Sequence, residues 1–201
     1  MNIEKLKYAE EKFFNLYPEG FNSLEMQKIV QKHKPEKMRS MAQDFFKKEN
    51  FSNYDEIVSS MQLLINRSSM ISVFDKPKFR DFVATLNSFD KETIAKGLEN
   101  QIHFDQKLGF EMISNILKKG KLASWSLVTI SLFYYRPQIE VFVKPTTTKG
   151  IIDFFEIEDI KYQSKPDYDF YIKFRDIINN MKNYVDKSLF PDNGAFSGFL
   201  M

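Results

Sequence analysis

The residues with the clearest chemical potential lie in one short string, Val143-Lys144-Pro145-Thr146-Thr147-Thr148-Lys149-Gly150. Its pattern predicts a strand that ends at Lys144-Pro145 and leads through the three threonines into a short helix. Free backbone N–H groups at a helix start, hydroxyl groups and two ammonium groups together favour an anion. The Gly-rich cradle of a nucleotide triphosphate loop is absent. The string therefore predicts either a small anion site or ordinary capping of a helix by threonine.

The string ends a basic segment, residues 118–149, that is also rich in aromatic rings. The whole chain has 29 basic and 27 acidic residues, whereas this segment has one acid, Glu140. Cations interleaved with rings suit single-stranded nucleic acid, because lysine and arginine contact phosphates while bases stack on rings. The alternative is that the rings belong to the core and the lysines to a solvated rim. The residues expected to bind an anion or nucleic acid are Trp125, Tyr135, Arg136, Lys144, Thr146, Thr147, Thr148 and Lys149.

A second pattern concerns metal-dependent nuclease chemistry. Glu140 lies in one predicted strand, and Asp159-Ile160-Lys161 lies in another. Two carboxylates in this order can hold Mg²⁺ while Lys161 steadies the nucleophile or the phosphate. The order resembles that of the PD-(D/E)xK nucleases, although a predicted helix intervenes where that family has adjacent strands. The resemblance implies a phosphodiesterase with Glu140, Asp159 and Lys161 at its catalytic centre.

Other catalytic chemistry has few residues to draw on. The chain has no Cys, which excludes disulfides, thiolate nucleophiles and cysteine-based metal sites. The two histidines, His33 and His103, are far apart in sequence and lack a context that would recruit carboxylates to a metal. No Gly-x-Ser-x-Gly elbow is present. We expect structural roles for both histidines and no cofactor, apart from Mg²⁺ in the nuclease alternative.

The elements before Gly120 are predicted to be about seven helices. Seven Gly and seven Pro in 201 residues favour long regular elements. Apolar residues recur three or four positions apart after each capping residue or proline. No repeated signature indicates a helical solenoid, so we expect an irregular bundle. The helices are expected to start near Ile3, Ser23, Pro35, Asn53, Asp75, Asp90 and Asp105.

The pattern changes after Gly120. Leu122–Tyr135 is apolar on all sides, which predicts a buried helix or a buried strand. Gln138–Lys144 alternates as a strand does, Asp159–Gln163 is a second predicted short strand, and residues 167–188 form a predicted long helix. The expected fold is therefore mainly α. It consists of a helical bundle over residues 1–120 and a small α+β portion over 121–201, packed as one globular unit.

Charge and the lengths of apolar stretches indicate where in the cell the protein is expected. The net charge of +2 provides no global field for nucleic acid or membrane. The longest uncharged stretch, Leu122–Tyr135, is shorter than the roughly 18 to 20 residues of a membrane span, and the N-terminus shows no apolar signal region. We expect a cytoplasmic protein without membrane contact.

Part of the chain resembles a motif string of an uncharacterised bacterial protein family. The matching residues are Trp125-Ser126-Leu127-Val128-Thr129, Arg136-Pro137 and Phe142-Val143-Lys144-Pro145-Thr146-Thr147-Thr148-Lys149. The resemblance covers the C-terminal portion alone. It implies a bacterial cytoplasmic protein and assigns neither an activity nor catalytic residues.

Three classes of function follow from these patterns. A nonenzymatic interaction protein is favoured, with a protein partner in an apolar groove between helices or on the basic 118–149 surface, because no catalytic set is complete. A nucleic-acid-binding protein, acting through the basic and aromatic segment or on a phosphate ligand, is the alternative. The second alternative is the Mg²⁺-dependent phosphodiesterase or nuclease.

Overall fold

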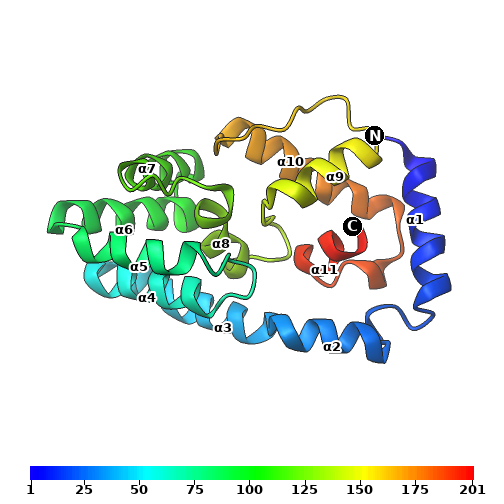
Figure 1. The fold of residues 1–201 in the computed structure, drawn as a ribbon, viewed down its shortest axis with the longest axis horizontal. Coiled ribbons are helices and arrows are strands. Elements are labelled where there is room, and N and C mark those ends of the chain that lie inside the picture. The colour runs from blue at the N-terminus through cyan, green and yellow to red at the C-terminus, as the bar shows by residue number, and fades with distance from the viewer. The chain divides into compact units, whose positions relative to one another are not determined.

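The computed structural model describes residues 1–201 and contains helices but no strand (Figure 1). Helices account for 73% of the residues, in eleven α-helices and four short 3₁₀ helices. The fold is therefore all-α, and the predicted α+β portion with two short strands is wrong. The first seven helices, α1 to α7, lie where the sequence predicted helices, although α6 begins at Ser88, after the cap Asn87, and not at Asp90.

The chain forms two compact units, one of which is inserted into the other in sequence. Unit 1 comprises Met1–Lys32 and Pro137–Met201, and unit 2 comprises His33–Arg136. These units do not coincide with the predicted division at residue 120. Gly120 ends one helix of unit 2, and the next helix packs within the same unit. Local periodicity could not show this, because a turn between two packed helices has the same sequence signature as a boundary.

Unit 2 is a helical bundle in which four α-helices, α4, α6, α7 and α8, begin at a capping side chain. Asn53, Asn87, Asp105 and Ser124 each accept a hydrogen bond from a backbone N–H three residues ahead. Such caps satisfy N–H groups that have no partner inside the helix. The elements of unit 2 are α3 (Pro35–Phe45), η2 (Lys48–Ser52), α4 (Tyr54–Arg67), α5 (Asp75–Thr85), α6 (Ser88–His103), α7 (Gln106–Lys119) and α8 (Trp125–Tyr135).

The apolar stretch that the sequence left open between helix and strand is α8. This helix packs against α3, α4, α6 and α7, which explains why it is apolar on all sides. Some of its polar groups are paired inside the bundle, whereas Ser131 Oγ is buried without a hydrogen-bond partner. The Tyr134 hydroxyl lies 2.9 Å from Ser68 Oγ, and Gln101 Nε2 donates to the Val128 carbonyl over 3.1 Å. α8 is therefore the central helix of unit 2.

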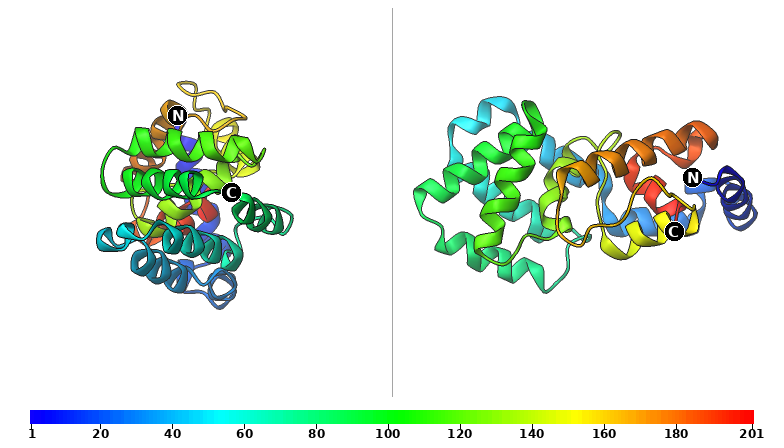
Figure 2. Two further views of the ribbon diagram at one scale, coloured as in Figure 1. Left: turned by 90° about the vertical axis from the view of Figure 1, so that its left-hand side faces the viewer. Right: turned by 90° about the horizontal axis from the view of Figure 1, so that it is seen from above.

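The helices α6 and α7 lie side by side and approach each other closely at two glycines (Figure 1 and Figure 2). A Cβ built on Gly109 would overlap the backbone N of Gln101 and the carbonyl O of Gly97, and would lie 2.6 Å from Gln101 Cα. A Cβ on Gly97 would lie 3.1 Å from Met112 Cβ. Only a residue without a side chain lets the two backbones come this close at Gly109.

Unit 1 is held together by contacts between its two chain segments, residues 1–32 and residues 137–201. The Asn2 N–H donates to the Phe155 carbonyl over 2.7 Å, and Lys5 forms an ion pair with Glu156 at 2.7 Å. The Phe13 ring meets the Phe199 ring edge to face at 5.6 Å. The elements of unit 1 are α1 (Ile3–Leu16), η1 (Gly20–Asn22), α2 (Leu24–His33), α9 (Pro145–Phe154), α10 (Tyr168–Met181), η3 (Lys182–Tyr184), η4 (Lys187–Leu189) and α11 (Asn193–Phe199). The predicted helix 167–188 thus ends its α-helical part at Met181.

The segment predicted as the first strand, Gln138–Lys144, has no strand partner because side chains occupy its carbonyl groups. Lys182 Nζ donates to Gln138 O over 2.9 Å, and Asn179 Nδ2 donates to Ile139 O over 2.8 Å. Asn193 Nδ2 donates to Glu140 O over 3.0 Å. The burial of the segment does not follow this alternation, because Ile139 is 51% exposed while Glu140, Val141, Phe142 and Val143 are all buried. The second predicted strand, Asp159–Gln163, is likewise irregular.

None of the helices has the combination of length and apolar character needed to cross a membrane.

Candidate functional site

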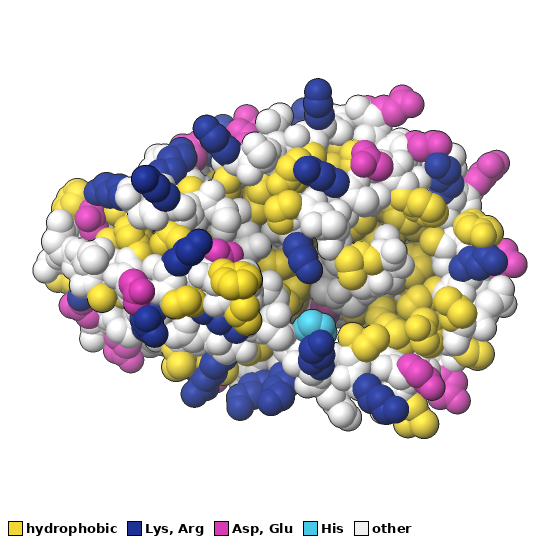
Figure 3. All heavy atoms as spheres, in the orientation of Figure 1, with side chains coloured by type: hydrophobic (Ala, Val, Ile, Leu, Met, Phe, Trp, Pro, Cys, Tyr) yellow, Lys and Arg dark blue, Asp and Glu magenta, His cyan; other side chains and the backbone are white.

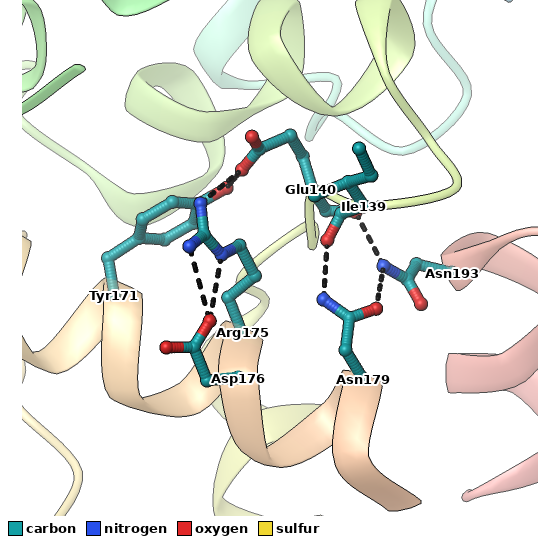
Figure 4. A network of polar contacts seen from close by, with 7 residues as sticks. All are labelled: Ile139, Glu140, Tyr171, Arg175, Asp176, Asn179 and Asn193. Carbon is teal, nitrogen blue, oxygen red and sulfur yellow. Dashed lines mark hydrogen bonds and ion pairs between the residues drawn. The ribbon is translucent and has the colours of Figure 1, made fainter. Parts of the chain in front are cut away.

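The most buried charged group of the protein is the carboxylate of Glu140, in unit 1. Glu140 is 1% exposed and is the only charged residue among the buried ones. The Tyr171 hydroxyl donates to Glu140 Oε2 over 2.8 Å, and Arg175 Nη1 lies 3.6 Å from the same oxygen (Figure 4). Tyr171 and Arg175 are four residues apart on one face of α10, which places both against the extended segment.

The electrostatics of this network keep Tyr171 protonated. Burial raises the pKa of the Tyr171 hydroxyl well above its ordinary value of 10, and the neighbouring Glu140 carboxylate raises it further. A protonated phenol donates a hydrogen bond to the carboxylate, and the Arg175 guanidinium supplies the opposite charge. The arrangement holds the extended segment on α10.

The structure lacks the two strands on which the nuclease prediction placed its acidic residues. That prediction required Glu140 and Asp159 on two strands, and the structure contains no strand. The Glu140 carboxylate is committed to Tyr171 and Arg175. No group of three or more carboxylate or histidine side chains is placed to hold a metal ion.

Sequence reasoning missed the residues that surround Glu140. It assigned α10 an apolar face and connected none of the polar row Tyr171, Arg175, Asn179 and Lys182 with Glu140. Their spacing of three and four residues is the signal that could have identified them, since such residues share one side of a helix. Asn193 contributes from α11 and had no local signal.

Alkaline pH is expected to weaken unit 1 through Tyr171. Because the pKa of Tyr171 is raised in the folded state, the unfolded chain loses this proton first, near pH 10, and binds fewer protons than the folded chain. Stability should then fall by about 1.4 kcal/mol per pH unit for this residue as pH rises toward the folded pKa. Urea unfolding followed by circular dichroism at about pH 9 and about pH 11 measures the change. Tyr171→Phe should show a smaller alkaline loss, and an unchanged loss would contradict the expectation.

The threonine string forms the first turn of α9, which has no side-chain cap at its start. Pro145 is the first helical residue, and Lys144 at the N-cap position makes no side-chain cap. The threonines therefore lie inside the helix and do not cap it. Thr146 and Lys149 are exposed, Thr147 Oγ1 donates to Met201 Sδ over 3.1 Å, and Thr148 Oγ1 is buried without a hydrogen-bond partner.

The other predicted anion-binding residues, Trp125, Tyr135 and Arg136, belong to unit 2. Trp125 is 1% exposed and lies 6.1 Å from the Phe110 ring, so its faces are covered by the core. Phe133, Tyr134 and Phe142, the other rings of the segment apart from Tyr135, are also buried. Tyr135 is half-buried beside the His103 ring, at 5.5 Å. Most of the rings expected to stack on bases are therefore core residues.

An open hollow lined in part by lysines lies in each unit. The α5 hollow of unit 2 has a volume of about 520 Å³, and the α9 hollow of unit 1 has a volume of about 440 Å³. Both lie within the range of small-ligand sites. The α5 hollow is lined by Lys78, Asp81, Phe82, Thr85, Gly120, Lys121 and Leu122. The α9 hollow is lined by Lys149, Ile152, Asp153, Ile160, Lys161 and Tyr162.

These features define an all-α protein of two helical units, with a structural carboxylate network in one unit and a lysine-rimmed hollow in each. No protein-family model, curated protein or solved structure matches the chain. The two hollows and the surface around them are the features of the structure that suit a ligand or a partner.

Proposed function

We propose that the protein is a nonenzymatic interaction protein and that unit 2 binds an acidic segment of a partner protein along α5. The observation that supports this proposal is the α5 hollow, where an apolar floor is flanked by two lysines that make no ion pair. One of these lysines, Lys121, belongs to the basic 118–149 segment that the sequence suggested as a surface for a partner.

The charge of the α5 hollow is positive. Its one acid, Asp81, is held by Arg80 through contacts of 2.7 and 2.9 Å. Lys78 and Lys121 have no such partner, whereas the neighbouring Lys119 is paired with Asp90 at 2.6 Å. Opposite charges across an interface steer association and select the partner. An acidic segment is therefore the complementary occupant.

The apolar part of the surface runs along α5. This helix buries Phe79 completely, while Phe82 is half-buried against the turn at Gly120, where a Cβ would lie 2.5 Å from the Phe82 ring. Phe74, at the start of α5, is 73% exposed. Because Phe74, Lys78 and Phe82 are four residues apart, they lie in one row on the helix. Figure 3 shows apolar patches among basic side chains on this part of the surface.

A side-chain row of this kind matches an amphipathic peptide that places apolar anchors between acidic residues. Exposed aromatic residues are frequent binding anchors, because they bury much area with little loss of conformational freedom. The lysines at the hollow then contact the carboxylates of the peptide. Hydrophobic anchors and charged flanks together favour an acidic peptide over a basic one.

Reversing the charges of Lys78 and Lys121 is expected to abolish most of the binding of an acidic peptide. The probe is a fluorescein-labelled peptide in which leucine and phenylalanine alternate with glutamate, measured by fluorescence anisotropy with the full chain. Lys78→Glu combined with Lys121→Glu should weaken binding about tenfold or more, because two attractive contacts become repulsive. Phe74→Ser should weaken it with a smaller dependence on salt.

The matched control is Lys37→Glu, which reverses an exposed lysine of α3 in the same unit. Its affinity should stay within about twofold of the unmodified chain, since it lies outside the hollow. Equal binding of a lysine-containing version of the peptide would contradict the proposal. Binding of a single-stranded oligonucleotide, without binding of the acidic peptide, would support nucleic-acid binding in its place.

A further inference from the structure

The α9 hollow of unit 1 combines two residues that the sequence had placed in separate patterns. Lys149 comes from the threonine string, and Lys161 comes from the Asp-Ile-Lys triple. Lys149, Ile152 and Asp153 share one face of α9, and the irregular segment 160–162 forms the opposite wall. The fold thus brings two ammonium groups and an aromatic ring to one hollow.

Neither ammonium group is paired with a carboxylate. Lys149 Nζ lies over the Tyr162 ring, 4.9 Å from its centroid. Asp153 follows Lys149 by four residues, a spacing that favours ion pairs on a helix, yet no ion pair forms. Lys161 is exposed and makes no ion pair either. A phosphate dianion between the two lysines could accept charge-assisted hydrogen bonds from both.

The floor of the hollow is apolar. Ile152 and Ile160 are buried beneath it, and the half-buried Tyr162 ring packs edge to face on Phe170 at 5.8 Å. Small-ligand sites commonly combine an apolar lining with a few polar groups that orient the ligand. A phosphate ion alone would use the lysines and leave this lining uncovered. A phosphate with a ring-sized apolar body would cover both.

We propose that the α9 hollow binds a small phosphate monoester that carries a flat ring. Lys149 and Lys161 hold the phosphate, and the ring covers Ile152, Ile160 and the edge of Tyr162. Asp153 lies in the same hollow, where it repels a dianion and can accept a hydrogen bond from the body of the ligand. The shared chemistry is that of nucleoside monophosphates and of phosphotyrosine. This proposal concerns unit 1 and does not depend on the peptide-binding proposal for unit 2.

Phenyl phosphate is the first probe, titrated to several millimolar into the full chain and followed by ¹H–¹⁵N NMR. It should bind at least about tenfold more tightly than inorganic phosphate or phenol, because it alone engages the lysines and the apolar floor together. Inorganic phosphate that binds as tightly as phenyl phosphate would overturn the proposal. Adenosine monophosphate and O-phosphotyrosine then distinguish the source. If neither binds more tightly than inorganic phosphate, the proposal is also overturned.

Substitutions test whether phenyl phosphate binds in the α9 hollow. Lys149→Gln combined with Lys161→Gln should weaken phenyl phosphate binding about tenfold, while Lys28→Gln, an exposed lysine of α2 in the same unit, should change it less than about twofold. Asp153→Asn should strengthen binding by a few fold, a change that a purely structural role would not produce. Unchanged melting temperatures show that the variants are folded. Equal losses in the double variant and in Lys28→Gln would overturn the assignment to this hollow.

Discussion

Gly109→Ala is expected to destabilise unit 2 by about 3 kcal/mol or more, since overpacking against backbone atoms cannot be relieved by rotating a side chain. The added Cβ would overlap the backbone of α6 at Gln101 and Gly97. Relief would require α6 and α7 to move apart, and these helices pack more extensively on each other than any other pair. The whole bundle of unit 2 would share the strain, because α8 packs on both of them.

Urea unfolding followed by tryptophan fluorescence measures this effect in unit 2. Trp125 is the only Trp of the chain, and it is buried in unit 2 against Phe110 of α7. The control is Gly150→Ala in α9 of unit 1, where a Cβ would meet nothing within 4 Å. There the same substitution should stabilise by about 0.5 to 1 kcal/mol, as measured by circular dichroism, because alanine favours a helix. A Gly109→Ala variant as stable as the unmodified chain would contradict the close approach.

Glu140→Ala is expected to destabilise unit 1 by about 3 kcal/mol, because it removes the buried acceptor of the network. The Tyr171 hydroxyl, which is fully buried, would lose the carboxylate to which it donates. Arg175 would lose one of its two acidic neighbours and keep Asp176, at 3.2 Å. The variant also leaves a cavity beneath the extended segment.

Glu140→Gln separates charge from hydrogen bonding in the same position. Its side-chain oxygen can still accept from Tyr171, but it no longer attracts Arg175, so the loss should be about 1 to 2 kcal/mol. Urea unfolding followed by circular dichroism measures both variants, since unit 1 contains no Trp. If both variants were as stable as the unmodified chain, the carboxylate would not serve the structural role that its contacts indicate.

The starts of the helices could be predicted because their signals are local. Asn53 and Asp105 accept a hydrogen bond from the backbone three residues ahead, as their sequence context suggested. Pro35 occupies the first turn of α3, where its missing N–H costs nothing. These features depend on residues within one turn of each other, and the pattern of apolar residues extends them over each helix.

The first strand was predicted wrongly because alternation in the sequence does not determine which side chains become buried. Apolar and polar residues alternate in Gln138–Lys144 as they do in a strand, yet Ile139 is 51% exposed and Glu140 is buried. Whether its backbone pairs with another strand depends on distant groups. Here Asn179, Lys182 and Asn193 supply the donors instead. No local signal shows that side chains from two later helices reach these carbonyls.

The candidate sites, too, could be predicted only in part from the sequence. The sequence showed that residues 118–149 are basic and rich in rings, because that is a matter of composition. It could not show that Trp125 is core, while Lys121 and Lys149 reach two hollows in different units. Burial depends on which elements pack over a side chain, and that is set by contacts between residues far apart in the chain.

The sequence by itself indicated that helices predominate, where most of the helices before Gly120 start and that charge is unevenly distributed, since each depends on neighbouring residues. Only the tertiary structure decided that α8 is a central helix, that unit 2 is inserted within unit 1 and that Glu140 belongs to a structural network. The tertiary structure also decided which lysines line the α5 and α9 hollows. The physical reason is that packing and hydrogen bonding join residues by distance in space, whereas a sequence pattern records only their distance along the chain.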